Sequence, residues 1–158
     1  SWLTDAHEEL VERLAAAVDL DFLVVAGGYT LLETRALRRI LPFCEAHNIG
    51  VIIAAPFASG WLVNPGATTY MYGEAPVEIV DRSNRMQEIC ARHNVPLAAA
   101  AIQFPLAHPA VAAVIPGAKT PAEPRQNHAL LRTEIPTAVW QDFKTAGLLG
   151  VDVPTPSH

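Results

Sequence analysis

The chain has 158 residues, of which 51% are hydrophobic and 17% are charged, and its formal net charge is -5 at pH 7. This length and composition predict one compact, soluble domain with a substantial core. The 11 Lys and Arg residues are scattered along the sequence, which excludes nucleic acid as a partner. The apolar run 97–106 is too short to span a bilayer, so we expect no membrane partner.

The positions of the cysteines and histidines argue against a disulfide and against a metal site. Cys44 and Cys90 each lie in an apolar helical pattern, which favours two reduced thiols over a disulfide and predicts a cytoplasmic location. The histidines lack metal-ligand spacing, so we predict no metal site. The chain begins at Ser1 without an initiator Met and soon enters a helical pattern; we therefore expect it to be processed or cut from something longer.

The amino-terminal third predicts a helix followed by a strand. Thr4 or Asp5 can cap a helix that runs to about Val18. Helical spacing predicts that its buried stripe consists of Leu10, Leu14, Ala17 and Val18. The continuous apolar run 22–26 then predicts a strand that is buried on both faces.

A second helix and strand follow. Leu37, Ile40, Leu41 and Cys44 have helical spacing up to a turn near Asn48, and Pro42 within them indicates a kink or a helix start. The apolar run 51–55 begins about 29 residues after the first strand. This spacing is typical of a βαβ unit in a parallel sheet.

The long irregular segment 56–73 follows the carboxyl end of the second predicted strand, where α/β proteins commonly build sites. Its aromatic residues Trp61, Tyr70 and Tyr72 either line a sugar or pyridine pocket or anchor the loop. Both interpretations stay open at this point.

The carboxyl-terminal part predicts four more helices and one strand. One helix opens near Pro76 and ends near Asn94, and a small-residue helix covers 97–106. A third strand covers 112–115, a helix covers 121–131, and a last helix carries the apolar residues Val139, Trp140, Phe143 and Leu148.

The stretch 114–127 connects that strand to its helix through a predicted tight glycine turn. Thr120 is the expected N-cap and Pro121 the expected first helical residue. A helix start at the end of a strand suits an anion such as phosphate. An ordinary β-turn-α connection is the alternative, because a single glycine is weak evidence for a phosphate loop.

The order of these segments resembles the C-terminal half of an aldo-keto reductase, within the group of D-threo-aldose, L-fucose and pyridoxal 4-dehydrogenases. The resemblance is carried by 20–32, 56–62 and 95–106, and it is strongest over 114–127. It implies an α/β fold that is the C-terminal portion of a (β/α)8 TIM barrel, with parallel strands and outer helices. Residues 1–158 would form a single partial barrel, strands six to eight plus the C-terminal helix, with the N-terminal half absent.

The resemblance also implies a cofactor site. The loop after the seventh barrel strand would contact the pyrophosphate through Ala55, Phe57, Ser59 and Gly60. The loop and helix after the eighth strand would hold the adenosine end through Gly117, Ala118, Lys119, Thr120, Glu123, Gln126 and Asn127. Gln126 and Asn127 either bond adenine through their amides or face solvent.

Two departures from the family pattern bear on the cofactor. NADP-preferring members carry an Arg where Glu123 stands and a basic residue where Gly117 stands, so the resemblance favours NAD over NADP. Lys119 is the counter-argument, because it could still reach a phosphate. The aromatic ring and the Gln that hold nicotinamide in many members are replaced by Ala54 and Ala26. Nicotinamide placement would then depend on Tyr29 or on the missing half.

No catalytic residue is predicted in this chain, because the family's catalytic Asp, Tyr, Lys and His all come from the missing part. Lys119 and Lys144 are the only lysines, and neither has a Tyr and an Asp placed beside it. Tyr29 is a lone candidate proton donor, against a packing role at a strand end.

The expected function is therefore that of an NAD(P)-dependent oxidoreductase acting on an aldose, a pyridoxal-like compound or a similar small alcohol or aldehyde. The chain alone is expected to be inactive. The alternative is a non-catalytic nucleotide-binding or structural half-barrel; an unrelated flavodoxin-like domain fits the predicted helix pair less well. Unpaired sheet edges predict pairing with the missing N-terminal half or self-association.

Overall fold

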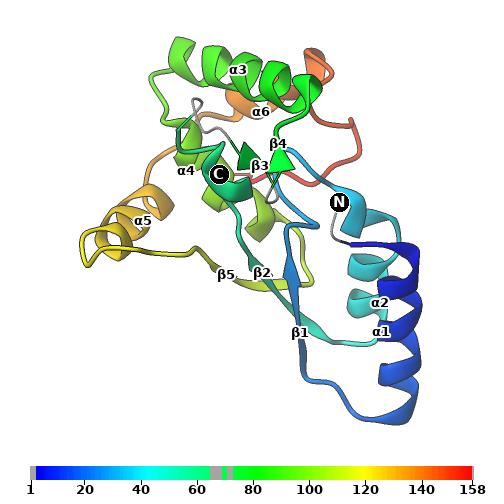
Figure 1. Ribbon diagram of the computed structural model, residues 1–158. Coiled ribbons are helices and arrows are strands. Elements are labelled where there is room, and N and C mark those ends of the chain that lie inside the picture. Colours follow the sequence, from blue (N-terminus) through cyan, green and yellow to red (C-terminus); the bar gives the residue numbers. More distant parts are fainter. Residues whose placement is uncertain (1–2, 65–68, 71–72, 158) are drawn as a thin grey trace.

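A three-stranded parallel sheet organises the fold. The computed structural model describes residues 3–64, 69–70 and 73–157. The strands β1 (Phe22–Ala26), β2 (Gly50–Ala54) and β5 (Val111–Ile115) lie side by side in that order (Figure 1). Both neighbouring pairs are parallel. The predicted α/β class with parallel strands and helices is confirmed.

The helices follow the predicted order, with shifted ends. The 3-10 helix η1 (Arg35–Arg38) and α2 (Ile40–Ala46) connect β1 to β2, so Pro42 lies in the first turn of a helix rather than at a kink. The connection from β2 to β5 contains η2 (Ala58–Gly60), the short strands β3 (Thr69–Tyr70) and β4 (Gly73–Glu74), α3 (Val77–Arg92), α4 (Leu97–Gln103) and η3 (Phe104–Ala107). The last helices are α5 (Glu123–Leu131) and α6 (Thr137–Thr145).

One face of the sheet is buried and the other is exposed. Val51 and Ile53 of β2 are fully buried in the core with side chains of α2 and α4. Phe22 and Val24 of β1 remain 60% and 50% exposed on the opposite face. The prediction that the first strand is buried on both faces is wrong, because the described part of the chain packs helices over one face only.

The register shows which residues share the exposed face. Parallel neighbours in register project to the same side, and Val24 is aligned with Ile52 while Ala54 is aligned with Ile115. We call this surface the exposed sheet face and define it by eight residues: Phe22, Val24, Ala26, Gly50, Ile52, Ala54, Ala113 and Ile115.

The core itself contains both cysteines. Cys44 of α2 and Cys90 of α3 are buried and free, as predicted, and burial raises the pKa of the Cys90 thiol to about 12. Ala99, Ala100 and Ala101 of α4 are fully buried, and their small side chains allow close packing. None of the helices that the structure describes has the length and apolarity of a membrane span.

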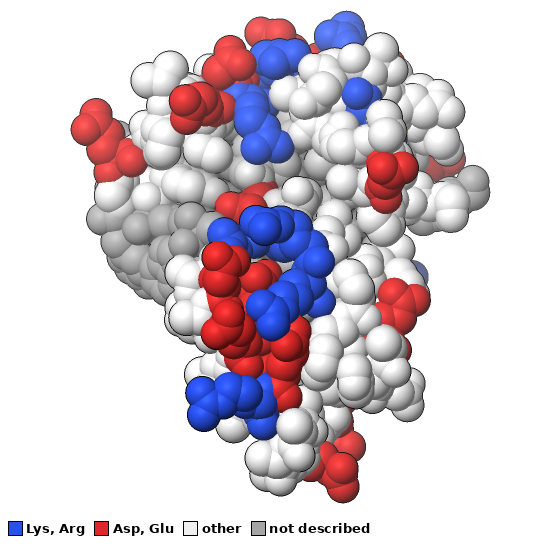
Figure 2. Space-filling view, turned by 90° about the vertical axis from the view of Figure 1, so that its right-hand side faces the viewer, with Lys and Arg blue, Asp and Glu red and all other residues white. Residues whose placement is uncertain are grey.

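Helix α1 (Asp5–Ala17) packs with a mixed side inward: Glu8 is buried, Glu12 is half-buried, and Val11 and Ala15 lie against the core. Thr4 is its N-cap, as predicted, and forms a capping box with His7. Arg35 bonds Asp5, and Arg39 donates to both oxygens of Glu12 at 2.5 and 2.6 Å. Figure 2 shows Asp, Glu and Arg side chains interleaved on this side of the molecule.

These ion pairs turn the predicted apolar stripe outward. Leu10, Leu14 and Val18 are about half exposed, whereas Glu8 is buried. The predicted buried stripe of α1 is therefore wrong, because the guanidinium groups of η1 and its C-cap attract the acidic face.

Arg82 of α3 joins three segments that are distant in sequence. Its guanidinium donates to the carbonyl oxygens of Leu32 at 3.0 Å, Leu148 at 2.9 Å and Leu31 at 3.4 Å. The loop after β1 and the segment after α6 are thereby held against α3, which lies beside α6 at the top of Figure 1.

Replacing Arg82 should destabilise the fold. Arg82→Met keeps the aliphatic stem but leaves partly buried carbonyl groups without their donor, and we expect a loss of about 2–3 kcal/mol in the free energy of unfolding. Arg85→Met is the matched control, since Arg85 is more exposed and donates only to Ala146 O among the described carbonyls. Urea unfolding should show a loss below about 1 kcal/mol for the control; equal losses would contradict the assigned role of Arg82.

The Arg39 contact makes the docking of α1 sensitive to acid. The hydrogen bond from Arg39 lowers the pKa of Glu12 below its ordinary value, so its stabilising effect is present above that value and is lost as the pH falls. Glu12→Gln should therefore lose less stability than wild type between about pH 6 and about pH 3 in urea unfolding. Glu9→Gln, on an exposed position of the same helix, should follow the wild-type pH dependence.

Candidate cofactor site

The carboxyl ends of the three strands meet at one edge of the sheet. Ala26 is aligned with Ala54, and Ala54 with Ile115. The backbone N–H of Gly27 also donates to Ala54 O at 3.3 Å. The loops that follow β2 and β5 therefore start side by side, which is where ligands bind in parallel α/β sheets. The structure brings the beginnings of both predicted loops together.

The loop after β2 has an unusual backbone. Ala55, Ala58 and Ser59 have φ values of 54°, 49° and 61°, and Gly60 has a φ of 93°. Left-handed conformations are uncommon for alanine and serine, and each costs free energy that the surroundings must offset. Such residues concentrate at binding sites, so this loop is a candidate site on conformational grounds as well as by its position.

Hydrogen bonds close this loop into a compact turn. Ala58 N donates to Ala55 O at 3.1 Å, and Gly60 N donates to Phe57 O at 3.0 Å. Ser59 is exposed and Phe57 half-buried. A side chain at Gly60 would meet open space, so the positive φ, rather than lack of room, favours glycine there. The four predicted residues of this loop thus belong to one turn.

The loop after β5 differs from the prediction. Gly117 does not have a positive φ and has open space around it, so the predicted tight glycine turn is wrong. Helix α5 begins at Glu123 with Ala122 as its N-cap, rather than at Pro121 with Thr120 as its N-cap. Gly117, Ala118, Lys119 and Thr120 form an exposed approach to the helix.

Glu123 explains why the helix begins late. Its Oε2 accepts the backbone N–H of Lys119 at 2.8 Å, and its Oε1 accepts the hydroxyl of Thr120 at 3.2 Å. The carboxylate folds back and orders the preceding loop. Sequence reasoning missed this role, although Thr120–Glu123 has the Thr-x-x-Glu spacing of a capping box.

The two predicted adenine contacts both lie on α5. Gln126 is exposed and Asn127 is half-buried. The helix follows the ordered loop directly and carries an acidic residue in its first turn. The amides are therefore accessible from the same side of the chain as Lys119, Thr120 and Glu123, whereas their contact with a nucleotide stays a prediction.

Several other candidate residues are structural. Tyr29 is fully buried against Phe104 and edge-on to His108, with ring centroids 5.0 and 6.1 Å apart. Burial raises the pKa of its hydroxyl strongly. Tyr29 is a core residue, so the proton-donor hypothesis is wrong and the packing alternative is confirmed. His108 forms the expected turn, with its Nδ1 accepting the backbone N–H of Ala110.

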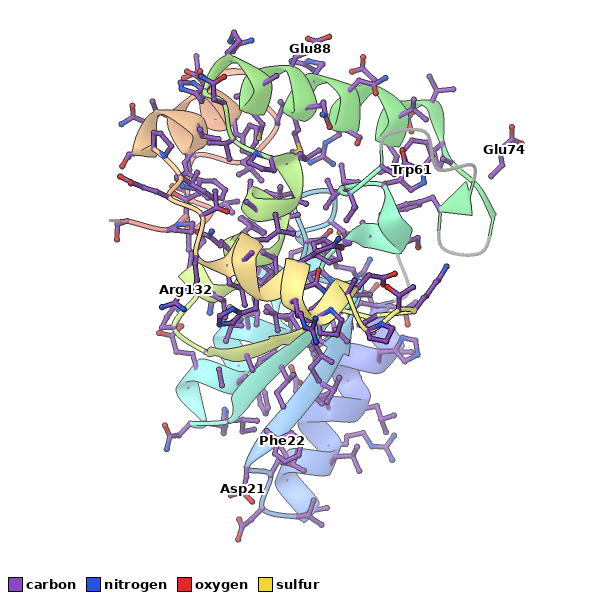
Figure 3. The ribbon with its side chains drawn as sticks, turned by 90° about the vertical axis from the view of Figure 1, so that its left-hand side faces the viewer. Asp21, Phe22, Trp61, Glu74, Glu88 and Arg132 are labelled. Atoms are coloured by element: carbon purple, nitrogen blue, oxygen red, sulfur yellow. The ribbon has the colours of Figure 1, made fainter. Side chains whose placement is uncertain are left out.

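The loop aromatics favour anchoring over pocket lining. Trp61 is buried, and its carbonyl accepts the Ser83 hydroxyl at 3.3 Å; Figure 3 shows it between η2 and α3. Tyr70 is half-buried, and burial raises its pKa. Tyr72 lies outside the described residues.

The described residues contain no cluster of His, Cys, Asp and Glu that could hold a metal. Of the two lysines, Lys144 donates to Val151 O at 3.0 Å and Lys119 stands in the exposed loop. Neither lies beside the buried Tyr29 hydroxyl, for which the structure shows no hydrogen-bond partner among its described residues.

Comparison with known proteins identifies the class to which this fold and these loops belong. Residues 3–147 match the model of the Aldo/keto reductase family, and the chain belongs to that family. Solved structures agree on the fold: an aldo-keto reductase from Bacillus halodurans in its holo form has a TM-score of 0.69 at 21% identity, covering 92% of this chain and 48% of that one. The glycerol dehydrogenase from Gluconobacter oxydans has a TM-score of 0.67 at 16% identity, covering 95% and 48%.

Two curated relatives are more similar in sequence. The chain is 40% identical to D-threo-aldose 1-dehydrogenase from a Pseudomonas species, covering 94% of this chain and 45% of the relative. It is 36% identical to pyridoxal 4-dehydrogenase from Microbacterium luteolum, covering 89% and 42%. The expected resemblance to this group is confirmed, and the chain spans less than half the length of these relatives.

The loop-ordering role of Glu123 can be tested without a ligand. Glu123→Gln leaves one oxygen to accept the Lys119 N–H, and its amide meets the Thr120 hydroxyl only if that hydroxyl turns round to accept, so both contacts lose the charge of the carboxylate and become weaker. We expect amide hydrogen exchange across residues 117–122 to accelerate about fivefold, which corresponds to about 1 kcal/mol. Glu88→Gln is the control because Glu88 projects outward from α3 (Figure 3). Unchanged exchange in Glu123→Gln would show that the loop is ordered by other contacts.

Proposed function

We propose that this chain is the cofactor-holding portion of an NAD(P)-dependent oxidoreductase that acts on an aldose, a pyridoxal-like compound or a similar small alcohol or aldehyde. The observation that supports this is that Ala54 and Ile115 are aligned, so the two loops that we assign to the cofactor start at adjacent strand ends. The substrate class is supported by the 40% and 36% identity to an aldose and a pyridoxal dehydrogenase. We further propose that residues 1–158 form one partial (β/α)8 TIM barrel, strands six to eight plus the C-terminal helix.

The residues present suit the two ends of a dinucleotide. The turn 55–60 offers an exposed Ser59 hydroxyl and a backbone already held in a strained conformation beside the strand end. The first turn of α5 adds the partial positive charge of a helix N-terminus. We assign the pyrophosphate to Ala55, Phe57, Ser59 and Gly60, and the adenosine end to Gly117, Ala118, Lys119, Thr120, Glu123, Gln126 and Asn127. When bound, the nicotinamide accepts or supplies the hydride.

Glu123 favours NAD over NADP in this proposal. Its carboxylate would repel a 2′-phosphate, whereas its remaining lone pairs can accept a ribose hydroxyl. The two hydrogen bonds from Lys119 and Thr120 hold the carboxylate at the start of α5, so it has little freedom to move aside. Lys119 supplies an opposing positive charge, and its side chain is exposed.

The proton-transfer residues are assigned to a part of the barrel outside this chain. Tyr29 is sealed in the core, and Lys144 is bonded to a backbone carbonyl. We propose that the chain alone is inactive and that activity requires the N-terminal half of a barrel as a partner. The two buried free thiols support a reducing compartment, which we propose to be the cytoplasm.

The second candidate is a non-catalytic nucleotide-binding or structural half-barrel. It is favoured by the same burial of Tyr29, which removes the chain's one candidate proton donor. The two candidates make different predictions for a complete barrel. The first expects it to act on the substrate class of the relatives, and the second expects no turnover.

Calorimetric titration of the chain with NAD and with NADP tests the cofactor assignment. We expect NAD to bind about tenfold more tightly, a difference of about 1.4 kcal/mol. Glu123→Arg should reverse the preference, and Glu88→Arg, which adds the same charge on α3, should not. Loss of binding to both nucleotides would favour a purely structural chain.

An activity assay of the same material with D-threo-aldoses and pyridoxal should give no NAD reduction. Turnover by the chain alone would overturn the assignment of the chemistry to another part of the barrel.

A further inference from the structure

Helix α3 carries one hydroxyl group on its buried face. The buried residues of this helix are Ser83, Met86, Ile89 and Cys90, and Ser83 is fully buried. A hydroxyl among apolar side chains lowers stability unless it has a hydrogen-bond partner. The partner here is the carbonyl oxygen of Trp61, which accepts from Ser83 Oγ at 3.3 Å. The hydroxyl therefore connects α3 to the loop after β2.

Helix stability does not account for a serine at this position. Alanine has a higher helix propensity than serine, and an alanine would bury no polar group there. A serine inside a helix commonly bonds a carbonyl of its own preceding turn. Ser83 instead donates to a segment 22 residues away in sequence. The role of its hydroxyl therefore lies in the segment that it bonds.

That segment is the direct continuation of the strained turn 55–60. Trp61 is buried and lies between η2 and α3 (Figure 3). Its backbone N–H donates to Ala58 O at 3.3 Å, and the N–H of Leu62 donates to Phe57 O at 3.3 Å. Ala58 has a φ of 49°, so its conformation must be held by its surroundings. A bond that fixes Trp61 to α3 therefore also fixes the left-handed part of the turn.

The preceding residue of the same helix holds a neighbouring strand-end loop. Arg82 donates to the carbonyl oxygens of Leu31 and Leu32, which lie in the loop after β1. The strand ends from which the two loops start, Ala26 and Ala54, are aligned in the sheet. Two consecutive residues of α3 thus set the position of one loop relative to the other.

We propose that Ser83 is a positioning residue for the nucleotide. Its hydrogen bond to Trp61 holds the turn 55–60 in the left-handed conformation that receives the pyrophosphate. This inference rests on the proposed function, in which that turn binds the pyrophosphate. Ser83 is buried, so it acts through Trp61 and not by contact with the ligand. Without its hydroxyl the turn opens more often, and the apparent affinity falls with the population of the closed turn.

Ser83→Ala tests the hold on the turn, with Ile89→Val as the matched control. Each substitution removes one non-hydrogen atom from the buried face of α3, and urea unfolding measures the stability that each variant loses. Amide hydrogen exchange across residues 57–62 should accelerate about fivefold in Ser83→Ala, as expected for the loss of one hydrogen bond. In Ile89→Val it should stay as in wild type, because amides that exchange by local opening do not respond to global stability.

Binding measurements separate positioning from a merely structural role. Calorimetric titration should show NAD binding about two- to fivefold more weakly to Ser83→Ala than to wild type, and equally to Ile89→Val and wild type. Adenosine lacks the pyrophosphate, so an NMR shift titration should give the same affinity for all three proteins. A general loss of structure would instead weaken the binding of both ligands.

The positioning role and the proposed function fail in different ways. A wild-type chain that binds no NAD contradicts the proposed function, and the exchange rates still show whether Ser83 holds the turn. If wild type binds NAD and a folded Ser83→Ala matches it in both exchange and affinity, the positioning role alone is overturned. Equal acceleration of exchange in Ser83→Ala and Ile89→Val has the same consequence.

Discussion

The alignment of three parallel strands at their carboxyl ends is the constraint on which the other features depend. Parallel strands require long crossovers, and in this chain those crossovers supply the helices that cover one sheet face. The same alignment places Ala26, Ala54 and Ile115 in one row. The segments that follow the three strands therefore start next to one another. They are the buried loop with Tyr29, the strained turn 55–60 and the loop that leads to α5.

The opposite face of the sheet has no covering layer among the described residues. Parallel sheets are normally covered on both faces, whereas β1 and β2 alternate between buried and more exposed residues, with Val25, Val51 and Ile53 buried. The uncovered side carries apolar residues of the kind that other sheets bury. Helix α1 behaves consistently, because its acidic residues Asp5 and Glu12 pair with Arg35 and Arg39 while Leu10 and Leu14 stay about half exposed. The acidic residues of α1 thus have partners within the chain, whereas apolar residues of α1 and of the exposed sheet face remain accessible to solvent.

Local sequence was sufficient for those parts of the fold that depend on neighbouring residues. The three strands, the Thr4 cap and the free buried thiols follow from short apolar runs, capping chemistry and helical spacing. The burial of the first strand and of α1 was predicted wrongly because it depends on distant partners: the arginines of η1 and the missing cover of a sheet face. The start of α5 was displaced by a side chain three residues beyond the expected cap. Glu123 is visible in a Thr-x-x-Glu pattern, but the direction in which its carboxylate folds is decided by the loop.

The strained turn after β2 shows how a binding loop can keep its shape independently of the catalytic residues. Ala55, Ala58 and Ser59 adopt left-handed conformations in a turn that contains local hydrogen bonds, such as Ala58 N to Ala55 O and Gly60 N to Phe57 O. Buried Ala58 holds the turn against the core. These contacts within the chain contribute to offsetting the free-energy cost of this backbone. A preformed turn of this kind retains its shape whether or not proton-transfer residues stand across from it, which is the physical argument behind our proposal that this chain binds the nucleotide and that catalysis lies in another part of the protein.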